Sequence, residues 1–450
     1  MKEQIQELIA SKRFKEAKDI LSNENASDIA ELIKDLEIQD IAKLFRLVKK
    51  EDAADVFSYL PLTIETELLA YLTDKEAVEI INEMFADDAT DVLEEMPANV
   101  VTRLLKQCDA DTRKDINKLL NYPEDSAGSV MTVEYAHLVN NITIKQALST
   151  LRRETSEYET INTCYVVDEK RKLVGELSLK DIILANPEDI VGDIARKDPV
   201  CVRTTADQED VAKLFKKYDL TVMPVVDSED RLVGIITIDD IVDIIEEETT
   251  EDIEKMAAIL PTDKPYLDVS IWETWKTRIP WLLLLMISAT FTGSIISSFE
   301  DKLAIIPILT AYIPMLMDTG GNAGSQASVT IIRSLSLNQI ELRDILKVMW
   351  KELRVAICTG FTLALANFGK LMLIDKTLLN YDITVYVAIV ICLTIFVIVV
   401  VAKLIGCTLP IITKRLGFDP AVMASPFITT IIDALGLLVY FRIATMVLMK

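Results

Sequence analysis

One acidic residue stands inside an otherwise uncharged apolar stretch near the end of this 450-residue chain. Asp433 follows two isoleucines and precedes the sequence Ala-Leu-Gly, with no Lys or Arg beside it. A charge inside an apolar segment of membrane length is costly, which makes it a functional candidate by default. Its carboxyl group either stays protonated, pairs with a distant cation or faces a water-filled path, and we favour the path.

A second carboxyl group meets a glycine-rich sequence. Asp318 precedes residues 319–326, which include Asn322 and Gln326. Glycines let helix backbones approach closely, and polar side chains can hydrogen-bond between helices. A tight helix crossing and a pore-lining element both fit this sequence. Asp318 itself either caps a glycine turn or lines a pore.

Five apolar stretches would place these groups in a bilayer. A helix rises about 1.5 Å per residue, so about 20 apolar residues cross a hydrocarbon core of about 30 Å. We expect the second stretch to be interrupted at Asp318 and by the glycines that follow. The expected spans are 279–299, 303–332, 355–374, 383–402 and 421–440.

Basic residues gather on one side of these spans. They precede the first span and fill the connections between the second and third and between the fourth and fifth. Positive residues favour the cytoplasmic side, so the N-terminal half is expected in the cytoplasm and the C-terminus outside. These residues are Lys276, Arg278, Arg333, Arg343, Lys347, Lys351, Arg354, Lys403, Lys414 and Arg415.

Charge divides the chain into two parts. From Ile271 to Lys450 there are 15 basic and 11 acidic residues, a net charge of +4, whereas the first 270 residues carry −27. So acidic a region argues against nucleic acid as a partner, because binding nucleic acid needs clustered positive charge. The plain interpretation is a solvated acidic surface, and the sharper one is a set of sites for divalent cations.

The residue types also limit the metal and the class of protein. There is one histidine, and the six cysteines form no CxxC pair. Zn²⁺, Ni²⁺ and Cu²⁺ favour imidazole and thiolate, whereas Mg²⁺ and Ca²⁺ take carboxylates, carbonyls and water. A hard cation is therefore expected. With no phosphate-binding loop, metal-hydrolase motif or nucleophile–base pair, we do not expect an enzyme.

Two internal repeats organise the N-terminal half. Residues 51–61 match residues 87–97 at a spacing of 36, with apolar residues at helical intervals. This repeat predicts stacked short helices, an α-solenoid over residues 1–122. Residues 165–181 match residues 224–240 at a spacing of 59, and each copy reads as strand, turn, strand and helix.

This second repeat resembles a pair of CBS domains, placed at 123–185 and 186–244. The resemblance implies an α/β module that often binds adenine nucleotides, so ATP is a candidate ligand. Lys180, Asp181 and Thr237 are candidate contacts, whereas Thr163 stands where an aromatic stacking residue would help. An acidic helix within 245–277 then leads to the first span, as a gating element or as a simple linker.

In this order the parts resemble the MgtE family of Mg²⁺ channels and transporters, over essentially the whole chain. The most specific segments are 320–326 and 417–436. The resemblance implies a multidomain membrane protein with an α-solenoid N domain, an α/β tandem CBS pair, a connecting (plug) helix and an all-α five-helix transmembrane domain over 278–450. It also implies a homodimer in the cell membrane, with the pore between the two membrane domains.

The resemblance assigns roles to residues. Asp433 corresponds to the selectivity carboxylate, and two copies would hold a hydrated Mg²⁺, since this ion sheds water reluctantly. Ser425 stands where an asparagine is common near the inner mouth. The pore-lining candidates are Asp318, Asn322, Gln326, Ser425 and Asp433. The metal-sensing candidates are Asp55, Asp87, Asp91, Asp207, Glu209, Asp219, Asp239, Asp240, Asp243, Glu248, Glu251 and Asp252.

We therefore expect passive Mg²⁺ influx that cytoplasmic Mg²⁺ shuts off. Facing carboxylates would repel at low Mg²⁺, and bridging ions would favour a compact, closed form. One alternative is a carrier for another divalent ion, such as Ca²⁺, Mn²⁺ or Co²⁺. Another is a membrane receptor that senses nucleotide, although an anchor needs neither Asp433 nor the glycine segment.

Overall fold

The structure is a computed structural model that describes residues 5, 7–9, 11, 13–21, 24–46, 50–155, 158–262, 266, 267, 269–300, 304, 306–423 and 425–448. For residues 50, 51, 423, 425 and 448 only the backbone is described. The chain divides into two compact units, Met1–Glu246 and Glu247–Lys450, and each is considered by itself.

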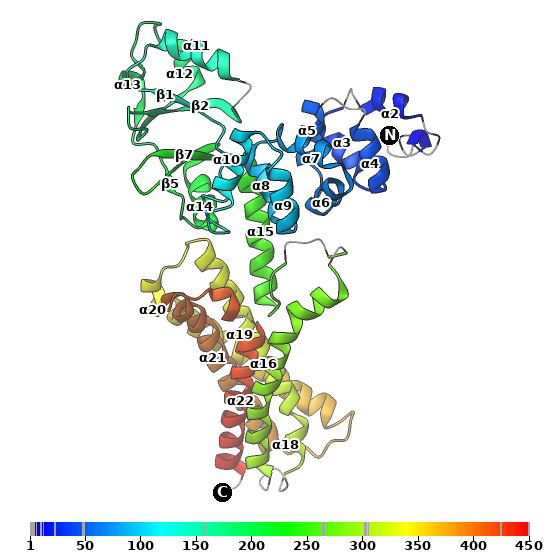
Figure 1. Ribbon diagram of the computed structural model, residues 1–450. Helices are drawn as coiled ribbons and strands as arrows, with labels where there is room; N and C mark the ends of the chain where they lie inside the picture. Colours follow the sequence, from blue (N-terminus) through cyan, green and yellow to red (C-terminus); the bar gives the residue numbers. More distant parts are fainter. Residues whose placement is uncertain are drawn as a thin grey trace. The chain divides into compact units, whose positions relative to one another are not determined.

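Short helices of eight to ten residues form the first part of unit 1 (Figure 1). Each turns an apolar face into a shared core that includes Leu44, Phe57 and Leu93. Pro61 and Pro97 stand at the N-caps of α6 and α9, where a fixed φ starts a new helix. This confirms the predicted helical domain. The helices are α2 (Phe14–Leu21), α3 (Ala26–Ile33), α4 (Ile38–Phe45), α5 (Lys50–Ser58), α6 (Leu62–Tyr71), α7 (Asp74–Ile81), α8 (Ala86–Glu94), α9 (Ala98–Leu105) and α10 (Ala110–Leu119).

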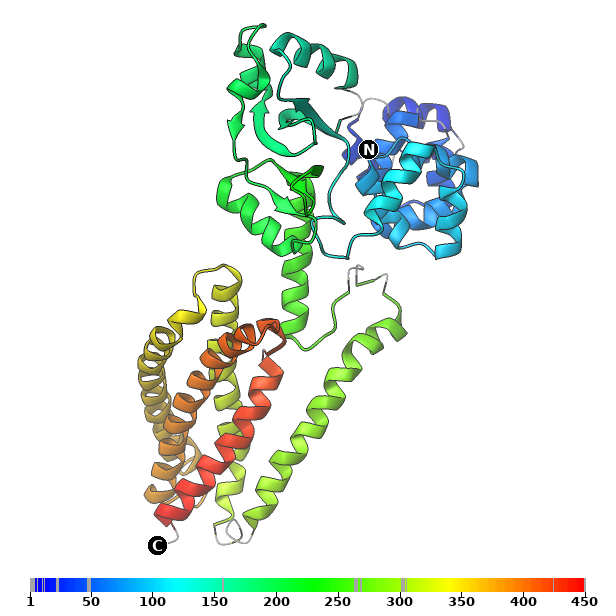
Figure 2. The ribbon, with the colours of Figure 1, turned by 60° about the vertical axis from the view of Figure 1, so that its left-hand side comes forward.

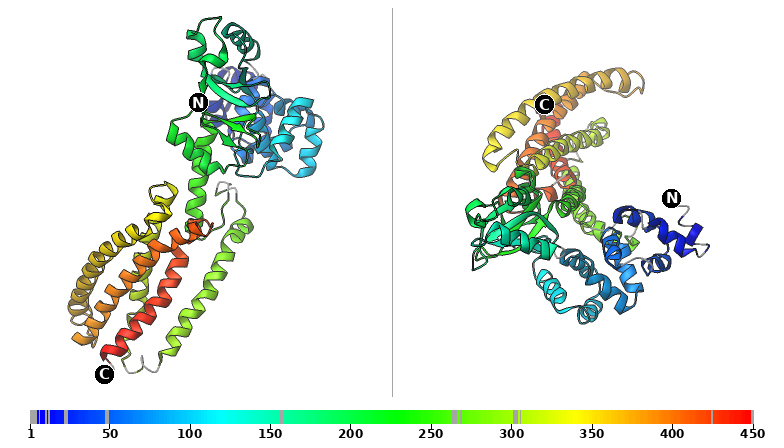
Figure 3. Two further views of the ribbon diagram at one scale, coloured as in Figure 1. Left: turned by 90° about the vertical axis from the view of Figure 1, so that its left-hand side faces the viewer. Right: turned by 90° about the horizontal axis from the view of Figure 1, so that it is seen from above.

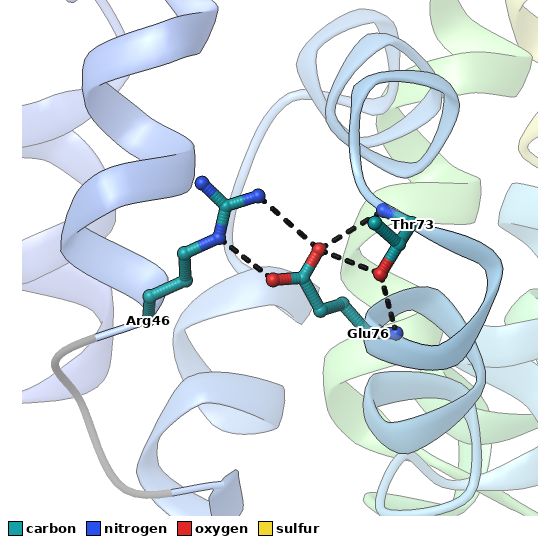
Figure 4. A network of polar contacts seen from close by, with 3 residues as sticks. All are labelled: Arg46, Thr73 and Glu76. Atoms are coloured by element: carbon teal, nitrogen blue, oxygen red, sulfur yellow. Dashed lines mark hydrogen bonds and ion pairs between the residues drawn. The ribbon is translucent and has the colours of Figure 1, made fainter.

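A polar contact links neighbouring repeats (Figure 4). Thr73 caps α7, and its Oγ1 and the carboxylate of Glu76 form a reciprocal capping box. Arg46, just after α4, donates its Nε to Glu76 Oε1 at 2.7 Å. The guanidinium and the Thr73 contacts lower the pKa of Glu76 to about 2. A charge-assisted bond of this kind fixes the register of one repeat on the next.

The two predicted CBS copies form two sheets in the rest of unit 1. The first, in the order β1-β2-β3-β4, contains β1 (Tyr135–Val139), β2 (Thr160–Val167), β3 (Leu173–Ser178) and β4 (Arg196–Lys197). The second contains β5 (Val202–Arg203), β6 (Val222–Val226) and β7 (Leu232–Thr237). Cys164 pairs with Leu177 in the first sheet, and Met223 pairs with Ile236 in the second. The same register therefore recurs at the spacing of 59 that the sequence shows.

Helices cover these sheets: α11 (Ile144–Glu154), α12 (Leu179–Leu184), α13 (Val191–Ile194) and α14 (Gln208–Tyr218). Figure 2 shows the helical repeats, in blue to cyan, beside the sheets in green. Ala86 of α8 and Leu119 share a buried cluster with Met223 and Ile241. The start of α8 therefore packs against the second sheet and against α15 (Ile238–Met256).

Unit 2 begins within α15 and continues into long helices. Four of its helical segments are long and apolar enough to cross a bilayer: Ile271–Ser298, Leu342–Asp375, Val385–Arg415 and Pro426–Val447. They run side by side in the left view of Figure 3. The elements are α16 (Ile271–Ser298), α18 (Ile308–Ala311), α19 (Ile313–Ser336), η2 (Leu342–Asp344), α20 (Ile345–Lys370), η3 (Leu371–Asp375), α21 (Val385–Arg415), η4 (Pro420–Met423) and α22 (Ser425–Leu448).

The expected second span differs from its prediction. α19 runs without a break from Ile313 to Ser336, so Asp318 and the glycines after it lie inside a helix and form no turn. The interruption lies instead at Tyr312, between α18 and α19. Glycine weakens a helix by only about 1 kcal/mol relative to alanine, which close packing easily offsets. The polar and glycine-rich α19 is absent from the four most apolar segments and is the fifth long helix of this part of the chain as described.

Candidate cation sites

The glycines of α19 allow its backbone to approach two neighbouring helices. A Cβ added at Gly321 would lie 2.8 Å from Thr429 Cγ2 of α22. One at Gly320 would lie 2.6 Å from Ile398 Cγ2 of α21, and one at Gly406 of α21 would meet the backbone of Gly324. Real side chains do not tolerate such distances, so larger residues would push these helices apart. The glycine segment is thus a tight helix crossing.

The polar residues of the same segment occupy the opposite face. Asp318, Asn322 and Gln326 are spaced by four residues and are all exposed within this chain. Residues four apart stack on one face of a helix, so these three form a polar stripe. Lipid cannot hydrogen-bond with such a stripe, which therefore needs water or another protein surface. The glycine face forms the tight helix crossing, and the polar stripe on the opposite face stays a candidate for lining a pore.

Asp433 lies near the middle of α22, where it interacts electrostatically with Asp318 of α19. Its Oδ1 is buried and has no hydrogen-bond partner. A buried polar atom without a partner costs free energy, and a second carboxylate nearby adds repulsion. A cation, or the water around one, would relieve both. Ser425 is the first residue of α22, and its side chain lies outside the described residues.

A second group of carboxylates is buried in unit 1, where α8 approaches α15 and the first sheet. Asp87 of α8 is 8% exposed, and its Oδ1 has no hydrogen-bond partner. It interacts electrostatically with Asp240 of α15, with the adjacent Asp88, and with Glu159 and Glu134. The Oε2 atom of Glu159 is likewise buried without a partner. We call Asp87, Asp88, Glu134, Glu159 and Asp240 the inter-domain acid cluster.

Burial and mutual repulsion raise the pKa values of this cluster. Burial and then Asp240 raise the pKa of Asp87 well above its usual range. Burial, partly offset by a hydrogen bond from Thr237, raises the pKa of Asp240 to about 6, and burial and Asp240 raise that of Glu159 to about 8. Among the residues that the structure describes, no three acidic, His or Cys side chains are spaced to ligate one ion directly. The mutual repulsion of these carboxylates would be reduced by a nearby cation.

Three members of this cluster were not predicted from the sequence: Asp88, Glu134 and Glu159. Asp88 also interacts with Asp239 and Asp55. Its position next to Asp87 in α8 was the sequence feature that could have identified it. Glu134 and Glu159 precede strands of the first sheet, and nothing in their local sequence marks them. Glu65 of α6, 5% exposed, was also missed, and burial with Asp88 and Asp91 raises its pKa to about 9.

The remaining predicted acids of unit 1 are more exposed. Asp55 and Asp91 lie on the outer faces of α5 and α8 and contribute charge to Asp88 and Glu65. Asp239 and Asp243 are exposed on α15, and burial with Glu246 raises the pKa of Asp243.

Three further predicted acids surround α14. Asp207 caps the helix and accepts a bond from the N–H of Glu209, whose side chain pairs with Lys213 at 2.9 Å. Asp219 ends α14 in a left-handed conformation, with a φ of 52°. The structure therefore separates these three residues, which shape α14, from the buried cluster.

The acids at the end of α15 belong to unit 2. Glu251 pairs with Lys255, and Lys255 also lies 2.8 Å from Asp419 Oδ2. Asp252 accepts a bond of 3.4 Å from the hydroxyl of Ser336. Glu248 is half-buried on the same helix. Glu251 therefore has a cation from the chain beside it, whereas the acids of the inter-domain acid cluster have other carboxylates as neighbours.

The nucleotide candidates lie at equivalent places in the two repeats. Asp181 accepts a bond from the Ser178 hydroxyl at 2.6 Å, and Asp240 accepts one from Thr237 at 2.6 Å. Lys180 and Asp181 are exposed at the start of α12, whereas Thr237 is buried. The exposed pair is accessible to a ligand, while the Thr237 hydroxyl is engaged with an acid of the inter-domain acid cluster.

Comparison with known proteins matches each part of the chain. Residues 313–443 match the MgtE family model, described as a divalent cation transporter, and residues 24–125 match the MgtE intracellular N domain. Residues 127–188 and 191–247 match the CBS domain. A magnesium transporter MgtE of Thermus thermophilus is 41% identical over 340 residues, covering 76% of this chain and 74% of that protein. A magnesium transporter MgtE of Bacillus subtilis is 36% identical, covering 75% and 73%.

Solved structures agree with this match for the N-terminal part. The cytosolic domain of the Mg²⁺ channel MgtE in complex with ATP is 38% identical, with a TM-score of 0.52, covering 54% of this chain and all of that one. The soluble part of a magnesium transporter is 29% identical, with the same TM-score, covering 55% and 97%. These relatives are transporters, in agreement with the expectation that this chain is not an enzyme. The chain belongs to the MgtE family of divalent cation transporters.

Proposed function

We propose that this protein is a Mg²⁺ channel in which Asp433 lines the ion path. The observation that carries the proposal is the buried, unpartnered Oδ1 of Asp433, on an apolar helix and facing the charge of Asp318. The polar stripe of Asp318, Asn322 and Gln326 on α19 supports a wet path beside it. The magnesium transporters to which the chain is 41% and 36% identical support Mg²⁺ as the ion.

Two copies would complete the pore. Mg²⁺ gives up its water reluctantly, so a pair of Asp433 carboxylates would hold the hydrated ion through charge and water-mediated bonds. A homodimer is further supported by α15, on which Ile238, Val242 and Ile245 are exposed at helical spacing. Such a stripe suits a second copy of the same helix. A dimer predicts twice the monomer mass by light scattering after the detergent is subtracted.

Gating is proposed to depend on the inter-domain acid cluster and on Asp239, Asp243 and the acids at the end of α15. Cytoplasmic Mg²⁺ would neutralise the facing carboxylates and favour the closed form, because the ion binds that form better. The proposal includes a division of the chain into five parts. These are an N domain (1–122), two CBS copies (123–185 and 186–244), a connecting helix (245–277) and a pore domain (278–450). The proposal also includes a cytoplasmic N-terminus and an external C-terminus.

ATP is a proposed ligand of the CBS pair. A solved relative of this region contains ATP, and Lys180 and Asp181 are exposed at the start of α12, accessible to a ligand. Titration of ATP with the protein, compared with Lys180→Gln, tests this. Unchanged ATP binding by the variant would exclude Lys180 from the site.

The conduction proposal is tested with Asp433→Asn in proteoliposomes that contain a Mg²⁺-sensitive dye. The substitution keeps the size of the side chain and removes its charge, so we expect Mg²⁺ influx to fall about 100-fold, the effect of about 3 kcal/mol. Asp382→Asn, on the connection before α21, is the matched control and should conduct normally. Influx through Asp433→Asn with unchanged rate and ion preference would contradict the assignment.

A further inference from the structure

The last turns of α15 carry a cation of the chain's own among acidic residues. Lys255, the single lysine of α15, contacts the carboxylate of Glu251 one turn earlier. Its Nζ also lies 2.8 Å from Oδ2 of Asp419, in the connection between α21 and α22. One ammonium group thus joins two carboxylates from distant parts of the sequence.

This ion pair belongs to a packed contact within unit 2. Met256 packs against Ile332 and the fully buried Ala421, in the same connection as Asp419. Beyond α15, the N–H of Leu260 donates to the carbonyl of Thr277 in α16 at 2.9 Å. The side chains of Lys255 and Asp419 are 23% and 35% exposed. An ion pair in such a setting is better fixed than one between mobile surface side chains.

The lysine stays charged in this contact. A lysine ammonium group is ordinarily charged at physiological pH, and the two carboxylates in contact with Lys255 favour that charge. At physiological pH an ammonium group is therefore always present between the two carboxylates. A divalent ion could bridge Glu251 and Asp419 only by displacing it.

Asp419 connects this contact to the helix that carries the pore carboxylate. Its Oδ1 accepts a bond of 2.8 Å from the N–H of Ala421 in η4, just before α22 begins. The Asp419 side chain is thus bonded to the backbone of η4, the element that precedes α22 in the chain. Asp433 lies two turns further along that helix.

We propose that Lys255 is a built-in cation that latches α15 to the α21–α22 connection and favours the closed pore even without Mg²⁺. The inference rests on the proposed channel function and deepens its regulation. The inter-domain acid cluster then contributes most to Mg²⁺ sensing, while Lys255 sets how far the pore is closed before Mg²⁺ binds. The free energies that Mg²⁺ binding and the Lys255 contact contribute to closure add, because both favour the same conformation.

The test is a charge-exchange cycle in the full-length protein, with Mg²⁺ flux measured in proteoliposomes and the cytoplasmic Mg²⁺ varied. Lys255→Gln and Asp419→Asn should each raise flux at low cytoplasmic Mg²⁺ and raise the half-closing Mg²⁺ concentration about threefold to fivefold. The double variant Lys255→Gln/Asp419→Asn should resemble either single one, since the same contact is lost. Lys255→Asp/Asp419→Lys should restore closure.

Lys347→Gln is the matched control, because Lys347 is 83% exposed and pairs with Asp344, only three residues before it in the chain. Its flux and half-closing concentration should equal those of the unaltered protein. Single variants that conduct and close like the unaltered protein would overturn the latch and leave the channel proposal standing. The latch would also be overturned if the double variant raised the half-closing Mg²⁺ concentration by the combined effect of the two single changes. This outcome holds whether or not Lys255→Asp/Asp419→Lys folds. Absence of Mg²⁺ flux through the unaltered, folded protein would contradict the channel proposal and the latch together.

Discussion

Two acidic regions of this protein balance their charge in different ways. In the inter-domain acid cluster, Asp87 and Glu159 have buried oxygens without partners and raised pKa values, with other carboxylates as neighbours. At the end of α15, Glu251 and Asp419 share the ammonium of Lys255. The first region gains most from a cation in solution, whereas the second already contains one. Acidic residues of one helix, such as Asp240 and Glu251 of α15, can therefore depend on Mg²⁺ to different degrees.

The largest expected contrast is in stabilisation by Mg²⁺. A ligand at 100 times its dissociation constant stabilises the folded state by about 2.7 kcal/mol, or a rise in Tm of roughly 5–10 °C for a unit of this size. We expect such a rise for residues 1–262 in millimolar Mg²⁺, since the ion relieves repulsion around Asp87. Asp87→Asn/Asp240→Asn should abolish it. Scanning calorimetry with and without Mg²⁺ measures the shift, and a variant that keeps the full rise would refute the role of the cluster.

Glu159 reaches the inter-domain acid cluster only through tertiary structure, and its substitution tests whether it contributes to Mg²⁺ binding there. Glu159→Gln should weaken Mg²⁺ binding about threefold to tenfold, because it removes one of several attracting charges. Calorimetric titration of Mg²⁺ measures this change. Glu188→Gln, on an exposed turn, removes the same charge elsewhere and should leave the affinity as it was. Equal affinities for both variants would exclude Glu159 from the site.

The pH dependence of stability gives a smaller effect, at Glu65. Burial with Asp88 and Asp91 raises the pKa of Glu65 from 4.5 to about 9 in the folded state. The unfolded chain releases this proton near pH 4.5, so the stability linked to Glu65 falls as pH rises from about 4.5 to 9, by at most about 1.4 kcal/mol per pH unit. Glu65→Gln should therefore stabilise the unit more at pH 8 than at pH 5. Urea unfolding at both values checks the sign, and an equal or smaller gain at pH 8 would contradict it.

Much of the architecture could be predicted because its signals are local. The spacing of 59 between the strand repeats recurs as equivalent pairs, Cys164–Leu177 and Met223–Ile236. Pro61 and Pro97 close the two matching segments of the 36-residue repeat, and each stands at the N-cap of the next helix. The prediction of an interruption at Asp318 was wrong, because the glycines serve close packing against α21 and α22 inside a continuous helix.

The parts that escaped prediction depend on contacts between distant residues. Glu134 and Glu159 join Asp87 only because the first sheet approaches α8, and no periodicity encodes that approach. The spacing of Lys255 from Glu251 could have been read as a helical ion pair, but its second partner, Asp419, lies far along the chain. The acids of α15 looked alike in sequence, and the folded structure distinguishes them.

The most direct test of the account is current through the purified protein in a voltage-clamped membrane, with Mg²⁺ raised stepwise on the cytoplasmic side. We expect a current carried by Mg²⁺ that falls as cytoplasmic Mg²⁺ rises in the unaltered protein, and that persists in Asp87→Asn/Asp240→Asn. In Lys255→Gln the current should still fall, but at a higher cytoplasmic Mg²⁺ concentration. A current that ignores cytoplasmic Mg²⁺, or one that closes equally well without the Asp87 and Asp240 charges, would contradict it.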